Sequence, residues 1–238
     1  YRRQRQMCIR DRYMNDEGIT AVFEFAGACS HLYESKKECP ADDVMSQWID
    51  TEREGLGSLP FSLDQIISDC LLLLDGGAET TRTVIARTLV ELAKDEDIWN
   101  DLKQSSDLST AVEEFIRFVT PIHNMCRVAT ENVQIDGVTI KEGDQVVLMY
   151  SSANRDPSHF DDPEILKVNR TPNHHLSFGH GTHFCLGASL ARLEIKIFFE
   201  EFLNRFKNLS LDMSEPPVEM PNSFVYGLKE AHIFLEKV

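Results

Sequence analysis

The stretch Leu176-Ser177-Phe178-Gly179-His180-Gly181-Thr182-His183-Phe184-Cys185-Leu186-Gly187 is a glycine-rich loop that presents one cysteine and then runs into a helix. Glycines in the loop permit backbone turns that residues with side chains resist. Beyond the loop, apolar residues recur at helical spacing, namely Leu190, Leu193, Ile197 and Phe198. Cys185 therefore precedes a helix N-terminus, where free N–H groups and the helix dipole favour an anion. A cysteine thiolate in that position is suited to bind a metal.

The loop also matches a known motif. Taken alone, a cysteine before a helix is more often structural, but the full string resembles the haem-binding signature of the cytochrome P-450 family, F-G-x-G-x-H-x-C-x-G. All fixed positions are matched, by Phe178, Gly179, Gly181, His183, Cys185 and Gly187. The resemblance implies that Cys185 is the axial ligand of the haem iron and that Phe178 and Gly179 contact the cofactor. A zinc site formed by His180, His183 and Cys185 is a weaker alternative, because a second ligand pair at the usual spacing is missing.

Length and composition set the limits for the rest of the chain. The 238 residues are enough for one or two domains with a sizeable core. A net charge of -15 argues against a nucleic-acid partner, whose phosphates would repel such a surface. The six cysteines include no C-x-x-C pair, so we expect a reducing, cytoplasmic setting without a disulfide framework. The longest apolar run, Cys70–Leu74, is too short to span a membrane, and we expect no membrane anchor.

The first twelve residues differ from the rest, because they hold five arginines in a chain that is otherwise acidic. A basic arm that binds a partner is one interpretation. We favour a non-native or disordered end for residues 1–12 and exclude it from the fold.

A long helix is predicted over Leu63–Ala93, opened by a Ser62-x-x-Gln65 capping box. Its middle, Asp75–Arg82, breaks the propensity rules, since each of two helical glycines costs about 1 kcal/mol relative to alanine. The simpler interpretation is a kink or a close helix crossing. The functional one is space for a flat ligand, with an acid and an alcohol beside it.

The same segment, Gly76-Gly77-Ala78-Glu79-Thr80-Thr81, resembles the distal-helix pattern of the cytochrome P-450 family. The resemblance implies that Gly76 and Gly77 let haem and dioxygen approach the helix, and that Glu79 and Thr80 are catalytic. Cleavage of the O–O bond consumes protons. Thr80 can donate a proton without carrying charge into the pocket, and Glu79 can then supply Thr80 with a new proton from solvent.

A further helix is predicted over residues 107–119, with Thr110 and Glu113 as its capping box. Glu114 and Arg117 are three residues apart and share a face of this helix. Alone, such a pair indicates a surface ion pair.

Together with the cysteine loop, however, Glu114 and Arg117 match the E-x-x-R motif of the family, and Arg170 matches the arginine that completes its structural triad. Leu166 and Lys167 depart from the family pattern beside Arg170. The resemblance implies that the triad locks the cysteine loop.

Residues 124–150 alternate as strands do, and Asp136-Gly137 predicts a hairpin turn within them. The resemblance implies that Arg127 and His183 bind the haem propionates, where cationic donors suit carboxylates; without it, Arg127 would be a solvated arginine. A terminal hairpin is expected near residues 216–227, and the resemblance implies that its tip faces substrate. The expected pocket residues are apolar: Leu72, Ile122, Met125 and Phe224.

The predicted fold class is mainly α with small β-sheets, and it resembles the C-terminal half of the cytochrome P-450 fold. Its parts are a long distal helix, the E-x-x-R helix, β-hairpins, the cysteine loop and a proximal helix. We expect residues 13–238 to be the C-terminal portion of a single domain whose N-terminal half is absent, and to be inactive as a fragment.

The resemblance implies a haem-thiolate monooxygenase that inserts one oxygen atom of O2 into an unactivated C–H bond of a hydrophobic substrate. Its cofactor would be haem b, and its electrons would come from NAD(P)H through a ferredoxin or flavodoxin-like donor with a reductase. Arg192 and Lys196 are candidates for a basic docking patch. We expect a monomer.

The motif variants look like those of bacterial steroid side-chain (cholestenone-type) hydroxylases, so a steroid side chain is the expected substrate. Alternatives are a fatty-acid or terpene hydroxylase of the same family, a haem peroxygenase, or a non-catalytic haem-binding remnant. A peroxygenase would carry a different acid arrangement in place of Glu79-Thr80.

Overall fold

The computed structural model describes residues 16–54 and 62–238. The chain divides into two compact units, residues 1–75 and 76–238, and the boundary falls inside one long helix. The segment 1–12, expected to be a non-native or disordered end, lies outside the described residues.

The first unit contains helix α2 (Asp16–Glu38), helix α3 (Val44–Glu54) and the start of helix α4 (Leu63–Lys94). A small core joins these helices and consists of Tyr33, Met45, Ile49 and Ile66. The capping box at the start of α4 is confirmed: Ser62 N–H donates to Gln65 Oε1 at 2.8 Å, and Gln65 N–H donates to Ser62 Oγ at 3.2 Å. The predicted long helix is thus correct to within one residue at each end.

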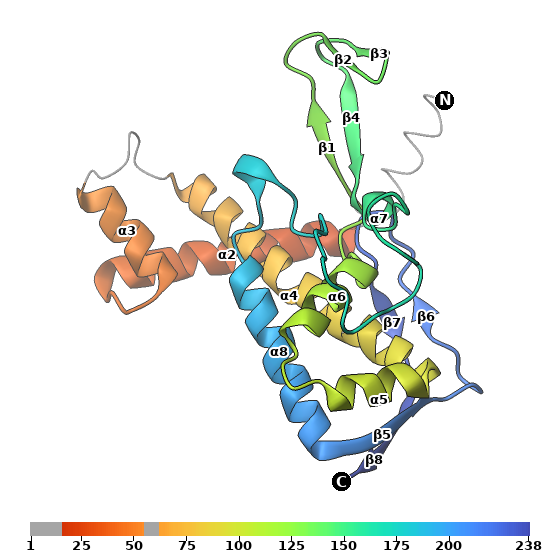
Figure 1. The fold of residues 1–238 in the computed structure, drawn as a ribbon. Coiled ribbons are helices and arrows are strands. Elements are labelled where there is room, and N and C mark those ends of the chain that lie inside the picture. Colours follow the sequence, from red (N-terminus) through yellow and green to blue (C-terminus); the bar gives the residue numbers. More distant parts are fainter. Residues whose placement is uncertain (1–15, 55–61) are drawn as a thin grey trace. The chain divides into compact units, whose positions relative to one another are not determined.

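The second unit is helix-rich with small sheets, which confirms the predicted fold class (Figure 1). After α4, its helices are α5 (Glu96–Gln104), α6 (Ser109–Val119), α7 (Tyr150–Ala153), the 3₁₀ turn η1 (Gly181–His183) and α8 (Ala188–Arg205). Its strands are β1 (Asn124–Val128), β2 (Val133–Ile135), β3 (Val138–Ile140), β4 (Gln145–Met149), β5 (Phe206–Leu211), β6 (Val218–Glu219), β7 (Leu228–Glu230) and β8 (Ile233–Lys237).

The strands of the second unit form antiparallel pairs: β1 with β4, β2 with β3, β5 with β8, and β6 with β7. Figure 1 shows β2 and β3 at the far end of the β1–β4 ladder. The turn between β2 and β3 has Asp136 at φ 48° and Gly137 at φ 78°, as a two-residue hairpin of the primed type requires. The hairpin predicted from the Asp-Gly pair is therefore confirmed.

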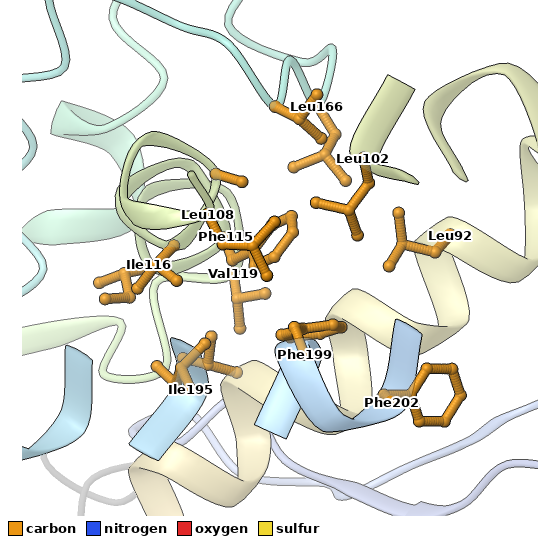
Figure 2. Close-up of a cluster of buried hydrophobic side chains, with 14 of the residues drawn as sticks. Leu92, Leu102, Leu108, Phe115, Ile116, Val119, Leu166, Ile195, Phe199 and Phe202 are labelled. Carbon is orange, nitrogen blue, oxygen red and sulfur yellow. The ribbon is translucent and has the colours of Figure 1, made fainter. Parts of the chain in front are cut away.

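The main core of the second unit lies between α5, α6, α8 and the C-terminal half of α4 (Figure 2). Phe115 of α6 and Phe199 of α8 lie at its centre, with ring centroids 4.8 Å apart. Burying one such side chain contributes roughly 2–3 kcal/mol. Because this core fixes α6 and α8, the cysteine loop directly before α8 has a firm attachment at its C-terminal end.

The capping box predicted for α6 is wrong. The helix begins at Ser109, so Leu108 is its N-cap residue. The Leu108 side chain makes no capping hydrogen bond. Asp107 Oδ1 accepts instead from the Ser109 N–H at 3.0 Å and from its hydroxyl at 2.8 Å. The Glu113 carboxylate is directed elsewhere, to partners distant in sequence.

One face of α8 carries exposed apolar side chains at helical spacing. Leu186, just before the helix, is 91% exposed, and Leu190, Leu193 and Ile197 follow on the same face. An apolar stripe of this kind is typical of a surface that packs against another element. Within residues 16–54 and 62–238, none of the helices combines the length and the apolarity needed to cross a membrane.

Residues 13–238 expressed alone are therefore expected to be poorly soluble or molten, and to retain less than one haem per chain. Replacing Leu190 and Leu193 with glutamine should raise the soluble yield, because it removes apolar surface from contact with water. The same change at buried Leu92 is the control and should lower the yield. A soluble monomer with a cooperative melting transition and one haem per chain, in the unmodified fragment, would contradict this expectation.

Candidate functional site

The cysteine loop is held in a tight backbone conformation. Gly179 and Gly181 have φ of 72° and 73°, in the left-handed region where glycine is favoured. The Gly179 N–H donates to the Leu176 carbonyl at 2.8 Å, and the Cys185 N–H donates to the Phe178 carbonyl at 2.9 Å. These bonds present an exposed Cys185 directly before the N-terminus of α8.

A buried ionic network lies behind the loop. Glu114 and Arg117 are both 0% exposed. Arg117 Nε and Nη2 donate to the two oxygens of Glu114 at 2.7 and 2.8 Å, and Arg170 Nε donates to the same oxygens at 3.0 Å. The structure thus brings the three residues of the expected triad together.

Lys167, one of the two residues that depart from the expected pattern beside Arg170, still contributes to this network. The Lys167 backbone N–H donates to Glu114 Oε1 at 2.9 Å, a bond that does not depend on the side chain. The Lys167 ammonium points to Asp162, at 2.8 Å. Asn173 Nδ2 adds a further bond to Glu114 Oε2, at 3.1 Å. These donors together offset the cost of burying the Glu114 carboxylate.

Asn154 connects the ionic network to the cysteine loop and was not identified from the sequence. It is fully buried, and its carbonyl accepts from Arg117 Nη1 at 2.7 Å. Its side-chain oxygen accepts the Leu176 N–H at 2.7 Å, and its Nδ2 donates to Ser177 Oγ at 2.8 Å. The start of the loop is therefore hydrogen-bonded to the residue that Arg117 holds.

A second charged cluster supports the loop from α8. Glu113 Oε1 accepts from Arg192 Nε at 2.5 Å, and Glu113 Oε2 lies 3.0 Å from both Arg192 Nη2 and His175 Nε2. The Arg192 guanidinium lies over the Phe178 ring, with 4.5 Å between its central carbon and the ring centroid. Sequence reasoning had assigned Glu113 to a helix cap and had not singled out His175.

The hydrogen bonds of this cluster perturb the acid–base behaviour of its members. Burial alone would raise the pKa of Glu113, but the hydrogen bonds from His175 and Arg192 outweigh burial and lower the pKa to about 2. The hydrogen bond to Glu113 raises the pKa of Arg192, and the nearby Cys185 charge adds to it. Glu113 and Arg192 are thus a fixed ion pair at neutral pH.

The two cations suggested for a docking patch are both paired with carboxylates. Arg192 binds Glu113, and Lys196 Nζ lies 2.8 Å from Asp107 Oδ1 and 4.0 Å from Glu200 Oε1. They therefore offer much less positive charge to a partner than the sequence suggested.

On α4, the expected acid and alcohol have separate partners. The Thr80 hydroxyl donates to the Gly76 carbonyl at 2.7 Å. Glu79 Oε1 lies 2.5 Å from Arg82 Nη2, and Glu79 Oε2 accepts from Arg82 Nε at 3.2 Å. A Cβ added at Gly76 or at Gly77 would meet nothing within 4 Å, so this face of the helix is open to a flat group.

The expected substrate-side residues of the second unit come from adjoining segments. Ile122 is bridged to Val225, and the His123 N–H donates to the Phe224 carbonyl at 2.9 Å. Met125 lies opposite Leu148 in the β1–β4 pair. Leu72 belongs to the first unit and is exposed there.

Arg87 of α4 holds the terminal hairpin and was also missed from the sequence. It forms an ion pair with Glu219 and donates to the carbonyls of Tyr226 and Gly227, the latter at 3.1 Å. Its guanidinium carbon lies 3.1 Å from the centroid of the Tyr226 ring. A Cβ on Gly227 would come within 3.1 Å of Glu79 Oε1, so the hairpin backbone packs against the acid.

The two expected propionate ligands are exposed. Arg127 Nη1 donates to the Cys126 carbonyl at 3.0 Å, and His183 ends η1 directly before the cysteine segment. Both side chains are accessible to a carboxylate, and their role stays a prediction.

The residues present fit haem. Cys185 supplies a soft thiolate ligand at a helix N-terminus, and the apolar neighbours Phe184 and Leu186, 50% and 91% exposed, suit a macrocycle. Gly76 and Gly77 leave the open helix face that a flat group requires. The part of the chain that the structure describes contains no cluster of three or more His, Cys, Asp or Glu side chains that could hold a metal ion. His180, His183 and Cys185 therefore do not form the zinc site considered as an alternative.

Comparisons with known proteins agree with this geometry. A family model described as cytochrome P-450 matches residues 96–235. A steroid C26-monooxygenase of Mycolicibacterium smegmatis is 40% identical over 79% of this chain and 46% of its own length. A linalool 8-monooxygenase of Pseudomonas putida is 37% identical over 89% of this chain and 51% of its own length.

Among solved structures, CYP109E1 from Bacillus megaterium in complex with testosterone superposes with a TM-score of 0.83 and 34% identity. The alignment covers 93% of this chain and 60% of that one. The chain spans about half the length of the curated relatives it matches.

The second charged cluster, formed by Glu113, Arg192 and His175, is expected to make a contribution to stability that depends on pH in the acid range. Because the folded-state pKa is lowered from 4.5 to about 2, the contribution is fully present above the unfolded pKa and is lost as the pH falls through about 2. Glu113→Gln should lower the free energy of unfolding by roughly 2 kcal/mol at pH 7 and by much less near pH 2. Denaturant unfolding of the complete gene product, meaning these residues with any coding sequence that precedes them, measures both values.

Glu201→Gln is the matched control, since Glu201 pairs with Arg205 on the exposed side of α8. This variant should change stability little at either pH. A Glu113→Gln effect that does not depend on pH would contradict the assignment.

Proposed function

The chain belongs to the cytochrome P-450 family, as its motifs indicated, and on this premise we propose that the protein is a haem-thiolate monooxygenase. It inserts one oxygen atom of O2 into an unactivated C–H bond of a hydrophobic substrate. The observation that carries the proposal is the exposed Cys185 before α8, held by its backbone bond to Phe178.

Several residues would hold the cofactor, which we propose to be haem b. Cys185 is the axial ligand, Phe178 and Gly179 shape the loop, and Gly76 and Gly77 leave room at the other face. Arg127 and His183 are proposed to bind the propionates. When bound, haem supplies the activation of dioxygen and the oxidation of the C–H bond. The triad of Glu114, Arg117 and Arg170 is proposed to keep the loop rigid, since each of its charges is paired.

The chain's own part in the reaction is to deliver protons. Thr80 Oγ1 holds a proton that it donates to the Gly76 carbonyl at rest, and rotation about χ1 frees that proton for the active-site side. Glu79 is proposed to replace the proton from solvent after leaving Arg82. A carboxylate held by one partly exposed arginine and by a long contact of 3.5 Å from the Thr83 hydroxyl can make that change at low energetic cost.

The protein is proposed to take electrons from NAD(P)H through a ferredoxin or flavodoxin-like donor with its reductase, in the cytoplasm and as a monomer. Residues 13–238 are proposed to be the C-terminal portion of one domain. The match over 96–235 and the alignments, which cover only 46% and 51% of two relatives, support this division.

A steroid side chain is the proposed substrate. Relatives named steroid C26-monooxygenase and a solved structure with testosterone favour it. A terpene is the second candidate, because a relative of similar identity is named linalool 8-monooxygenase. Apolar Ile122, Met125, Phe224 and Leu72 suit either one. Spectral titration of the complete gene product with a cholestenone-type steroid and with linalool separates them, and tighter binding of linalool would reject the steroid.

The axial-ligand assignment predicts a spectroscopic change. The complete gene product, reduced and exposed to carbon monoxide, should show the red-shifted Soret band of thiolate-bound haem. Cys185→Ala should lose this band, whereas Cys39→Ala, which removes another exposed cysteine, should keep it. Persistence of the band in Cys185→Ala would reject the proposed function.

The proton-delivery assignment predicts uncoupling. In the complete gene product, Thr80→Ala should bind substrate normally but yield roughly tenfold less hydroxylated product per electron, with hydrogen peroxide in its place. Thr80→Ser keeps the hydroxyl and should stay coupled. Equal coupling in all three proteins would show that protons reach the oxygen by another route.

A further inference from the structure

Phe178 is the residue through which the second charged cluster reaches Cys185. Its carbonyl accepts the Cys185 N–H at 2.9 Å. Its ring lies under the Arg192 guanidinium, at 4.5 Å, and next to the His175 ring, at 5.7 Å between centroids. The position of the Cys185 backbone N–H therefore depends on the contacts that hold Phe178.

Glu113 fixes two of the groups that touch the Phe178 ring, Arg192 and His175; the Phe184 ring is a third neighbour, with 6.0 Å between centroids. The two Glu113 oxygens bind Arg192 through Nε and Nη2, and one of them also binds His175 Nε2 at 3.0 Å. The Ser177 N–H donates to His175 Nδ1 at 3.3 Å, so the ring is held from both sides, by the loop backbone at Nδ1 and by Glu113 at Nε2. Arg192 contributes a guanidinium to the same carboxylate.

An arginine is required at this place by geometry. A planar guanidinium can lie flat on an aromatic ring and bind a carboxylate through two N–H groups at once. A lysine ammonium keeps the charge but can do only one of the two. The other arginine of α8, Arg205, pairs with Glu201; this pair is exposed and touches neither the ring nor the loop.

We propose that Arg192 is a positioning residue for the Cys185 ligand, acting through Phe178, a role that rests on the proposed haem-thiolate function. Arg192 presses the Phe178 ring into one orientation, and this keeps the Phe178 carbonyl where the Cys185 N–H needs it. Without Arg192 the acceptor moves, the loop loosens, and the thiolate is lost more readily as an iron ligand.

The test uses the complete gene product in its haem-bound form. Wild type, Arg192→Lys, Arg192→Gln and Phe178→Leu are reduced, given carbon monoxide and warmed to one fixed temperature. The rate at which the thiolate-type Soret band converts to the thiol-type band is then measured. Loss of one charge-assisted contact corresponds to roughly a tenfold rate increase, expected for both Arg192 variants. Phe178→Leu should behave alike, because it removes the ring on which Arg192 acts.

Arg205→Gln is the matched control on the same helix and should convert at the wild-type rate. The melting temperature of each protein is also recorded. If Arg192 had only a structural role, its variants would have a lower melting temperature but an unchanged rate of band conversion. If Arg192→Lys and Phe178→Leu both convert at the wild-type rate, the proposal is overturned while the proposed function stands. If wild type shows no thiolate band, both are overturned.

Discussion

The buried carboxylate of Glu114 is the interaction on which the site depends. An unpaired charge at 0% exposure would destabilise the fold by several kcal/mol, so the guanidinium groups of Arg117 and Arg170 have to be in place. Each of those arginines also binds backbone carbonyls of the segment before the cysteine loop, through Asn154 and Ile165. Neutralising one charge thereby fixes the path of a chain segment that has little regular structure of its own.

Adjacent residues of α6 divide the support of the loop between them. Glu114 faces the buried network and, through Asn154, holds the start of the loop. Glu113 faces α8 and, through Arg192, holds Phe178 in its middle. Because the core around Phe115 fixes α6 against α8, the two carboxylates act from one rigid element. Cys185 is exposed, yet its backbone is supported from both sides.

The opposite part of the site is held less firmly. Glu79 binds Arg82 on the surface of α4, in a pair that solvent weakens. The hairpin against it is fixed by Arg87, which is buried and stacks on Tyr226. The proposed proton route therefore starts from a partly exposed ion pair that lies against a firmly held hairpin.

The sequence alone determined what depends on neighbours a few residues apart: the Ser62–Gln65 cap, the Asp136-Gly137 turn and the left-handed glycines of the cysteine loop. It also indicated the family, because the motif carries those local constraints. It misassigned Glu113 as a cap, and it did not identify Asn154, His175 or Arg87. Apart from the Ser177 N–H that donates to His175, the side-chain partners described for these four residues lie 22 to 140 residues away, so only tertiary packing brings them together. The role of a buried polar residue depends on which groups are buried next to it and can hydrogen-bond to it. Those neighbours are set by the folded chain.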